Sequence, residues 1–149
     1  MIEPRSSRAE DLDGAAGELP ALPADTPVLD PAVLDSLRRL GERSGRDVLG
    51  ELSGLYLSTA TAQVRTAADL LRTRDLPELA RIAHALKGSS SVIGARRAAA
   101  SALALEDCCG LTASGLGGAS VESARAALAV FADELERFRA ELRRLGVVD

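Results

Sequence analysis

The strongest constraint on the fold is an apolar stripe in the last segment of the chain. Between Ser120 and Gly146, apolar side chains recur alternately three and four residues apart, with charged side chains between them. An amphipathic helix with such a stripe depends on other helices to cover its apolar face. The pattern predicts a helix that is capped by Ser120, runs to Leu145 and belongs to a helical bundle. The stripe consists of Val121, Ala124, Leu128, Phe131, Leu135, Phe138, Leu142 and Leu145.

Composition and local signals predict that the partners of this helix are helices too. Hydrophobic residues make up 46% of the 149-residue chain and aromatic residues only 2%. Ala and Leu, which favour helices, dominate the apolar fraction, whereas β-branched residues are few. We expect a short helix from Asp30-Pro31 to Leu40 that ends at Gly41, and longer helices at about 46–73, from the N-cap Asp75 past Lys87 toward Ser91, and at about 95–109. Glu78 lies where a capping box with Asp75 would place it, and Gly94 marks a break or a close approach.

These segments predict an all-α protein, an antiparallel four-helix bundle with an additional short N-terminal helix. The bundle domain covers residues 29–149. Residues 1–28, rich in Ala, Pro, Gly and acids, are interpreted as a flexible leader. The glycine-rich residues 110–119 are expected to form a loop.

The charge distribution excludes several functions. The formal net charge of −4 comes from residues 1–29, and the remaining residues are neutral. A neutral domain is a poor candidate for binding nucleic acid. No apolar run approaches a membrane span or a secretory signal, so we expect a cytoplasmic protein without membrane insertion. Cys108 and Cys109 are adjacent, and one histidine cannot complete a zinc site with them.

The histidine of the third predicted helix is expected to face solvent. At about 100° per residue, His84 lies roughly 160° from Leu86, whose neighbours on the helix surface are apolar. Lys87 points to the same side, and Gly88 follows His84 by one turn. His84 and Lys87 are the only histidine and the only lysine of the chain, beside 17 arginines.

These residue types suit phosphoryl transfer. A neutral imidazole is nucleophilic near neutral pH and can form a phosphoramidate. Lys87 would offset the charge of the phosphoryl group, Gly88 would leave room for a partner, and the hydroxyls of Ser89 or Ser91 could donate hydrogen bonds. No Mg²⁺ site is evident beside His84. On spacing alone, His84 could equally be an ordinary surface histidine and Lys87 part of a solvated face.

The motif resembles a known family. The run His84-Ala85-Leu86-Lys87-Gly88-Ser89-Ser90, followed by Ile93-Gly94-Ala95, resembles the signature of histidine-containing phosphotransfer (HPt) domains. Leu105-Glu106 is similar to a Leu-Glu pair of that family, and the resemblance covers about residues 28–146. Ser91-Val92 depart from the family pattern.

The resemblance implies a monomeric phosphoryl carrier of a two-component phosphorelay, without ATP binding or kinase activity. His84 would accept a phosphoryl group from a receiver-domain aspartate and pass it to another receiver. The partners would be receiver domains of response regulators or hybrid histidine kinases. The chain itself would hold no cofactor, because the receiver would supply Mg²⁺.

We expect the receiver to dock on the exposed side of the third helix near His84 and on the adjoining faces of the second and fourth helices. Ala80, Ala83, Gly88, Ser91 and Val92 would offer small or apolar contacts, and Arg81, Arg96 and Arg97 would form a cationic rim.

Two other functions compete with the relay. One is a non-catalytic adaptor on the same fold, which loss of His84 or Lys87 would favour. The other is an enzyme for a small molecule, against which the single histidine, with no acid beside it, and the lack of a phosphate-binding loop both argue. The sequence does not identify the kinase, the receiver or the direction of phosphoryl flow.

Overall fold

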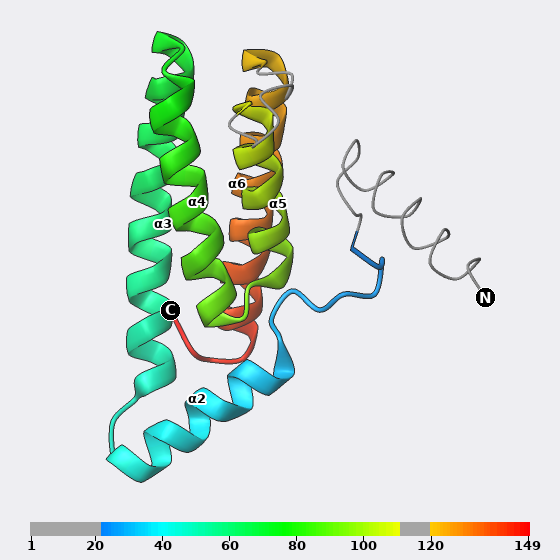
Figure 1. Ribbon diagram of the computed structural model, residues 1–149. Coiled ribbons are helices and arrows are strands. Elements are labelled where there is room, and N and C mark those ends of the chain that lie inside the picture. The colour runs from blue at the N-terminus through cyan, green and yellow to red at the C-terminus, as the bar shows by residue number, and fades with distance from the viewer. Residues whose placement is uncertain (1–21, 111–119) are drawn as a thin grey trace, which may run out of the picture.

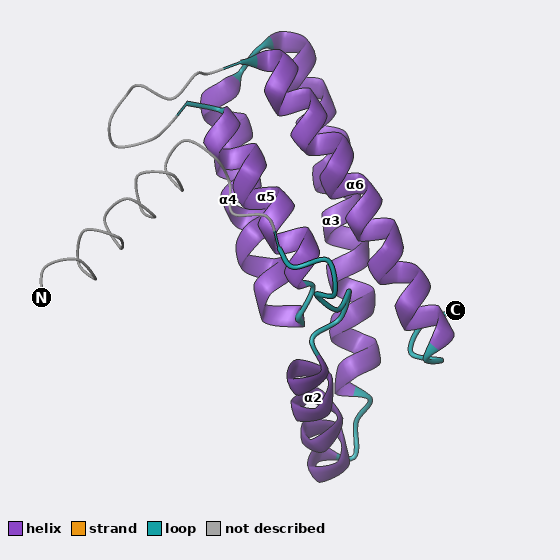
Figure 2. Ribbon diagram, turned by 90° about the vertical axis from the view of Figure 1, so that its right-hand side faces the viewer, coloured by secondary structure: helices purple, strands orange, loops and turns teal. Residues whose placement is uncertain are grey.

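The computed structural model describes residues 22–110 and 120–149, and all regular secondary structure in these ranges is helical. The helices are α2 (Pro31–Ser44), α3 (Val48–Thr73), α4 (Leu76–Ile93), α5 (Arg96–Cys108) and α6 (Val121–Arg144). Helices α3 to α6 run antiparallel in a bundle, and α2 lies across one of its ends (Figures 1 and 2). The predicted all-α bundle with a short N-terminal helix is confirmed. Residues 1–21 of the predicted leader and 111–119 of the predicted loop lie outside the described residues.

Side-chain caps fix the starts of three bundle helices close to their predicted positions. The carboxylates of Asp47 and Asp75 accept hydrogen bonds from the amides of Gly50 and Glu78, at 3.0 and 3.2 Å. The Ser120 hydroxyl accepts one from the Ser123 amide at 3.2 Å. The capping box at Asp75 is only half formed, since the Asp75 amide donates to the Leu70 carbonyl instead, at 2.9 Å. Each cap satisfies a backbone donor that the helix itself leaves unpaired.

The predicted end of α2 is wrong by one turn. The helix continues through Gly41 to Ser44 and ends at Gly45, whose φ of 71° is left-handed. The Gly45 amide donates to the Gly41 carbonyl at 2.9 Å. Gly41 serves the connection to α3, because a Cβ there would lie 2.8 Å from the carbonyl oxygen of Arg46. Two glycines therefore stand near the end of this helix, and the second is its left-handed cap.

Gly94 ends α4 and packs against the start of α2. Its φ is 84°, and its carbonyl accepts a hydrogen bond from the Asp30 amide at 2.8 Å. A Cβ at this position would lie 2.9 Å from the Cβ of Val33. The prediction of a break or a close approach is confirmed in both senses, because only glycine fits the conformation and the space.

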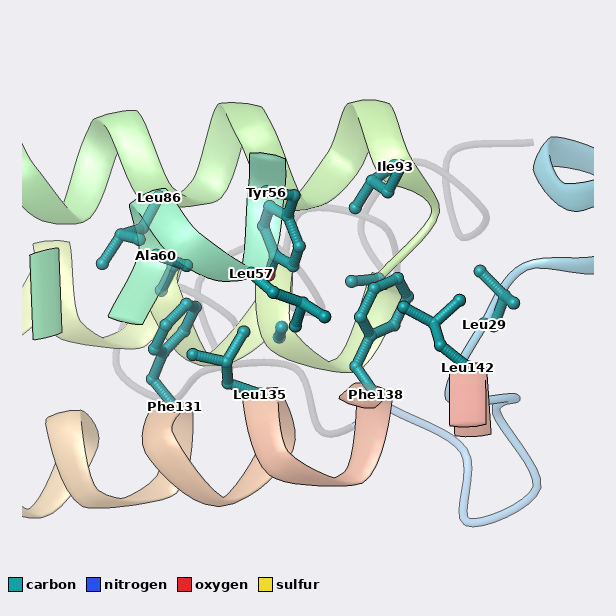
Figure 3. Close-up of a cluster of buried hydrophobic side chains, with 13 residues drawn as sticks. Leu29, Tyr56, Leu57, Ala60, Leu86, Ile93, Phe131, Leu135, Phe138 and Leu142 are labelled. Atoms are coloured by element: carbon teal, nitrogen blue, oxygen red, sulfur yellow. The ribbon is translucent and has the colours of Figure 1, made fainter. Parts of the chain in front are cut away.

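The core lies between the inner faces of helices α3 to α6. Figure 3 shows its larger cluster, in which apolar side chains of α3 and α4 meet a row from α6. The rings of Tyr56 and Phe138 pack edge to face, with centroids 5.4 Å apart and planes at 83°. Most of the stripe predicted on the last helix is buried, namely Ala124, Leu128, Phe131, Leu135, Phe138 and Leu142.

Arg97 joins two bundle helices through an ion pair and also reaches the segment before α2. The Arg97 guanidinium on α5 makes two hydrogen bonds to the Glu134 carboxylate on α6, at 2.9 and 3.2 Å. Thr26 is 8% exposed, and its carbonyl accepts a longer bond of 3.5 Å from Arg97. Contact with the bundle therefore begins before residue 29, the predicted start of the domain.

A buried hydrogen bond sets the register of α3 against α4. The hydroxyls of Tyr56 and Ser90 lie 2.7 Å apart, and both residues are buried. Burial raises the pKa of Tyr56 to about 12, although the bond to Ser90 opposes that shift. The phenol is therefore protonated at neutral pH, so this bond joins two uncharged hydroxyls.

The Tyr56–Ser90 bond should be visible in a double-mutant cycle. Tyr56→Phe and Ser90→Ala each leave one buried hydroxyl without its partner, which we expect to cost about 1–2 kcal/mol in the free energy of unfolding. The double variant removes both hydroxyls, so its loss should be smaller than the two single losses added. Urea denaturation of the four proteins measures this coupling, and strictly additive losses would show that the bond contributes nothing.

Candidate functional site

His84 lies in the middle of α4, on the side opposite the core. Leu79 and Leu86 of the same helix are fully buried, whereas the His84 side chain is 68% exposed. The prediction that His84 faces solvent is confirmed. Because α4 forms part of the bundle, the imidazole is held on a regular helix and not on a loop, which limits the directions that it can take.

The His84 ring is bonded to a carboxylate from the next helix. Nδ1 lies 3.0 Å from Oε2 of Glu106, a residue of α5 that stands 22 positions further along the chain. The Glu106 side chain is 26% exposed. The sequence-based statement that no acid lies beside His84 is therefore wrong. Helical spacing reveals neighbours on one helix, and this contact crosses between two.

The bond to Glu106 assigns different roles to the two ring nitrogens. An ionised carboxylate only accepts hydrogen bonds, so Nδ1 must carry the proton. In a neutral imidazole the lone pair then resides on Nε2. The arrangement presents an exposed ring whose nucleophilic nitrogen is Nε2.

Lys87 belongs to a small group of charges around His84. Burial, followed by the negative charge of Glu106, raises the pKa of Asp107, and the positive charge of Lys87 lowers it. Lys87 is half-buried, and Asp107 is exposed beside Glu106 on α5. The site thus combines one ammonium group with two carboxylates, so its formal charge is negative before any phosphoryl group arrives.

Gly88, Ser89 and Ser91 differ in what they can offer. Gly88 is exposed, and a Cβ there would meet no other atom within 4 Å. The Ser89 hydroxyl donates to the Leu86 carbonyl at 3.3 Å, and the Ser91 hydroxyl donates to the Lys87 carbonyl at 2.9 Å. Both hydroxyl protons are used within the helix, so donation from either serine to a phosphoryl group stays a prediction.

Part of the predicted docking surface is wrong. Ala80 and Ala83 are buried in the second core cluster, together with Leu105 of α5. The helical projection assigned one face of α4 to the core. Helix α5 also covers the adjacent side of α4, which buries these alanines. Arg97 does not form part of an open rim, because it is bound to Glu134.

Other members of the predicted surface are exposed. Ser91, Arg81 and Arg96 are open to solvent, and Val92 is 73% exposed. Leu55 of α3, the neighbouring helix, is 64% exposed. The Tyr56–Ser90 bond places Leu55 and Val92 at neighbouring levels of the bundle. We call Leu55, Gly88, Ser91 and Val92 the outer α3–α4 surface.

The cysteines show no features of a reactive pair. Burial is the main cause that raises the pKa of Cys108, and it raises that of Cys109 to about 11. Both thiols therefore remain protonated near neutral pH, and Cys109 packs in the core. They act as small apolar side chains.

The described ranges show neither a metal cluster nor a membrane span. Residues 22–110 and 120–149 contain no group of three or more His, Cys, Asp or Glu side chains that could hold a metal ion. None of the helices in this part of the chain is long and apolar enough to cross a membrane.

The helical bundle matches the model of a known protein family. The family model for the Hpt domain matches residues 51–141, which include all of α4 and α5. The chain belongs to the Hpt domain family. The matched residues include His84, Lys87, Gly88 and Glu106, whereas α2 precedes them.

A solved structure shows the same fold. The crystal structure of a candidate histidine-containing phosphotransfer protein from rice superposes with a TM-score of 0.67, at 19% sequence identity. The match covers 94% of this chain and 89% of the rice chain. The HPt-like architecture therefore extends to α2, beyond the residues that the Hpt family model matches. No curated protein matched this chain.

The assignment of the proton to Nδ1 can be tested directly. Nitrogen-15 NMR of the neutral imidazole should show Nδ1 protonated and Nε2 unprotonated in the wild type. Glu106→Ala removes the acceptor, so the ring should shift toward the Nε2-protonated form that exposed histidines usually adopt. A wild-type ring with its proton on Nε2 would contradict the assignment.

Proposed function

We propose that this protein is a phosphoryl carrier of a phosphorelay, in which His84 accepts a phosphoryl group from a receiver-domain aspartate and passes it to another receiver. Hpt domains act in such relays and interact with receiver domains. The observation that carries the proposal is the exposed His84 ring, whose Nδ1 is hydrogen-bonded to Glu106, which leaves Nε2 as the nucleophile. The chain needs no nucleotide for this role, because the donor is already phosphorylated.

In the transfer step, the Nε2 lone pair of His84 attacks the phosphorus atom of the phosphoaspartate. The P–N bond forms while the P–O bond breaks, and the electron pair of that bond leaves with the receiver carboxylate. Transfer onward is the reverse reaction with a second receiver. The bond from Nδ1 to Glu106 holds the ring in one orientation, which favours an in-line approach.

Lys87 and the partner would supply the positive charge that the phosphoryl group requires. The Lys87 ammonium lies on the next turn of α4 and would offset part of the phosphoryl charge. The neighbouring carboxylates of Glu106 and Asp107 make further positive charge necessary. We propose that a Mg²⁺ ion held by the receiver provides it, and that this chain holds no cofactor of its own.

The receiver would dock over the outer α3–α4 surface. The exposed side chains of Leu55 and Val92 offer apolar contact, and Gly88 leaves the approach to His84 open. Arg81 and Arg96 would meet acidic groups of the receiver at the edge of the contact. A single copy of the chain suffices for this arrangement, and we expect it to act as a monomer inside the cell.

Transfer to His84 is the first prediction of this function. When the protein is mixed with a labelled, phosphorylated receiver domain, acid-labile label should appear on the wild type and be absent from His84→Gln. The substitution should leave the fold intact, because the side chain is largely exposed and contacts the bundle through one surface bond. Gel autoradiography after acid and alkaline treatment measures the result.

The same assay can refute the proposal. Label retained on His84→Gln would place the site elsewhere. Failure to label the wild type with a broad panel of phosphorylated receivers would favour the adaptor function, in which the fold binds partners without phosphorylation.

Two substitutions at Gly88 should have different effects on stability and on phosphoryl transfer. Gly88→Ala should raise the free energy of unfolding by about 0.5–1 kcal/mol, because alanine favours the helix and its Cβ meets nothing. Gly88→Gln should fold as well but slow phosphoryl transfer from a receiver on the order of tenfold, a loss that corresponds to about 1.4 kcal/mol of contact energy. Urea denaturation and initial transfer rates measure the two effects.

Gly54 provides the matched control. It is also an exposed glycine within a helix, and a Cβ there would likewise meet no atom within 4 Å. It lines a cavity with Arg65 and Arg139 on the α3–α6 side of the bundle. Gly54→Gln should therefore leave transfer unchanged. Equal slowing by both glutamine variants would contradict the proposed docking surface.

A further inference from the structure

We infer that Glu106 controls the lifetime of phosphorylated His84 by keeping a proton on Nδ1 of the ring throughout the transfer cycle. This inference rests on the proposed function and goes beyond it, because it concerns how fast the phosphoryl group leaves. It starts from one contact, the 3.0 Å bond between Nδ1 and Glu106.

The position of the proton determines what kind of leaving group the ring is. When Nε2 bonds to phosphorus with Nδ1 still protonated, the ring becomes a positively charged phosphoimidazolium. Cleavage of the P–N bond then returns its electron pair to Nε2 and releases a neutral imidazole. If Nδ1 has lost its proton, the same cleavage must release an imidazolate anion, which is a far poorer leaving group.

Glu106 is placed to retain that proton. Its carboxylate opposes the positive charge that appears on the ring after phosphorylation, and the two charges are joined by a hydrogen bond. The Glu106 side chain is 26% exposed and the His84 side chain 68% exposed. Because the carboxylate is largely covered, water screens its charge less than that of a fully exposed group. Glu106 therefore favours retention of the proton on Nδ1 after phosphorylation.

The other charges near the site do not substitute for Glu106. On α5, Asp107 is exposed and interacts with Lys87 and Glu106. On α4, Lys87 carries a positive charge, which disfavours a protonated ring, and Arg81 is paired with Glu78 at 3.6 Å. On α3, Arg65 lines the cavity on the α3–α6 side. Glu106 is the group bonded to the ring.

Glu106→Gln tests the inference because it removes the charge and keeps the shape. The glutamine amide can donate to an unprotonated Nδ1 or accept from a protonated one, so the ring is free to lose its proton. Phosphohistidine in this variant should hydrolyse up to about tenfold more slowly near neutral pH, since a charge-assisted bond is exchanged for a neutral one. In acid, where solvent protonates both rings, the two rates should converge.

The measurement needs no partner protein. Wild type, Glu106→Gln and the control Glu136→Gln are phosphorylated with phosphoramidate, freed of the donor, and followed by phosphorus-31 NMR across a range of pH. Glu136→Gln makes the same change in an exposed carboxylate of α6 that pairs with Arg139 at 3.4 Å, and its profile should stay close to that of the wild type. Urea denaturation checks that the three proteins are equally folded.

Three outcomes would overturn the inference. Identical pH profiles for wild type and Glu106→Gln would show that the carboxylate does not hold the proton. An equal shift in Glu136→Gln would show a general effect of charge and not a bond to Nδ1. If phosphoramidate did not phosphorylate His84 in the wild type, the phosphorylated ring that the inference requires would not form. A failure confined to receiver domains would instead refute the proposed function and leave the hydrolysis profiles to decide this inference.

Discussion

The packing of α4 against α5 is the constraint on which the rest of the site depends. Ala80 and Ala83 are buried at this contact with Leu105, and side chains this small let the two helices approach closely. Leu105 points into the contact, so its neighbour Glu106 emerges at the edge, within reach of His84. A larger side chain at Ala83 would push the helices apart and lengthen the bond between His84 and Glu106. The core thereby positions the carboxylate that holds the ring.

The fold was largely predictable because its signals are local. Asp75 and Ser120 cap helices from within their own segments, and Gly94 ends α4 with a conformation that glycine adopts readily. The end of α2 was not predictable, since Gly41 and Gly45 both resemble a helix stop. The difference between them depends on the carbonyl of Arg46, which passes too close to Gly41 for any other residue. That contact forms only after the chain has turned between α2 and α3, so the local sequence does not reveal it.

The site was predictable as far as one helix can reveal it. The exposure of His84 follows from its angle relative to Leu86, but its bond to Glu106 spans 22 residues and two helices. The resemblance of Leu105-Glu106 to a family pair was the one signal that pointed to this residue. The prediction that Arg97 belongs to a cationic rim was wrong for the same reason, because its partner Glu134 lies 37 residues away on α6. Sequence patterns place side chains on a surface without revealing what lies opposite.

The two nitrogens of His84 depend on different parts of the molecule. Nδ1 is bound to Glu106, whose position follows from the α4–α5 contact, so the core determines which nitrogen carries the proton. Nε2 is accessible because the helix surface around Gly88 is empty, so the surface determines what can reach it. Substitutions in the α4–α5 contact should therefore alter proton placement, whereas substitutions on the outer α3–α4 surface should alter access. The α4–α5 contact and the outer α3–α4 surface thus act on different nitrogens of one ring. Substitutions that change which partner docks can therefore leave the chemistry of the phosphorylated histidine unchanged.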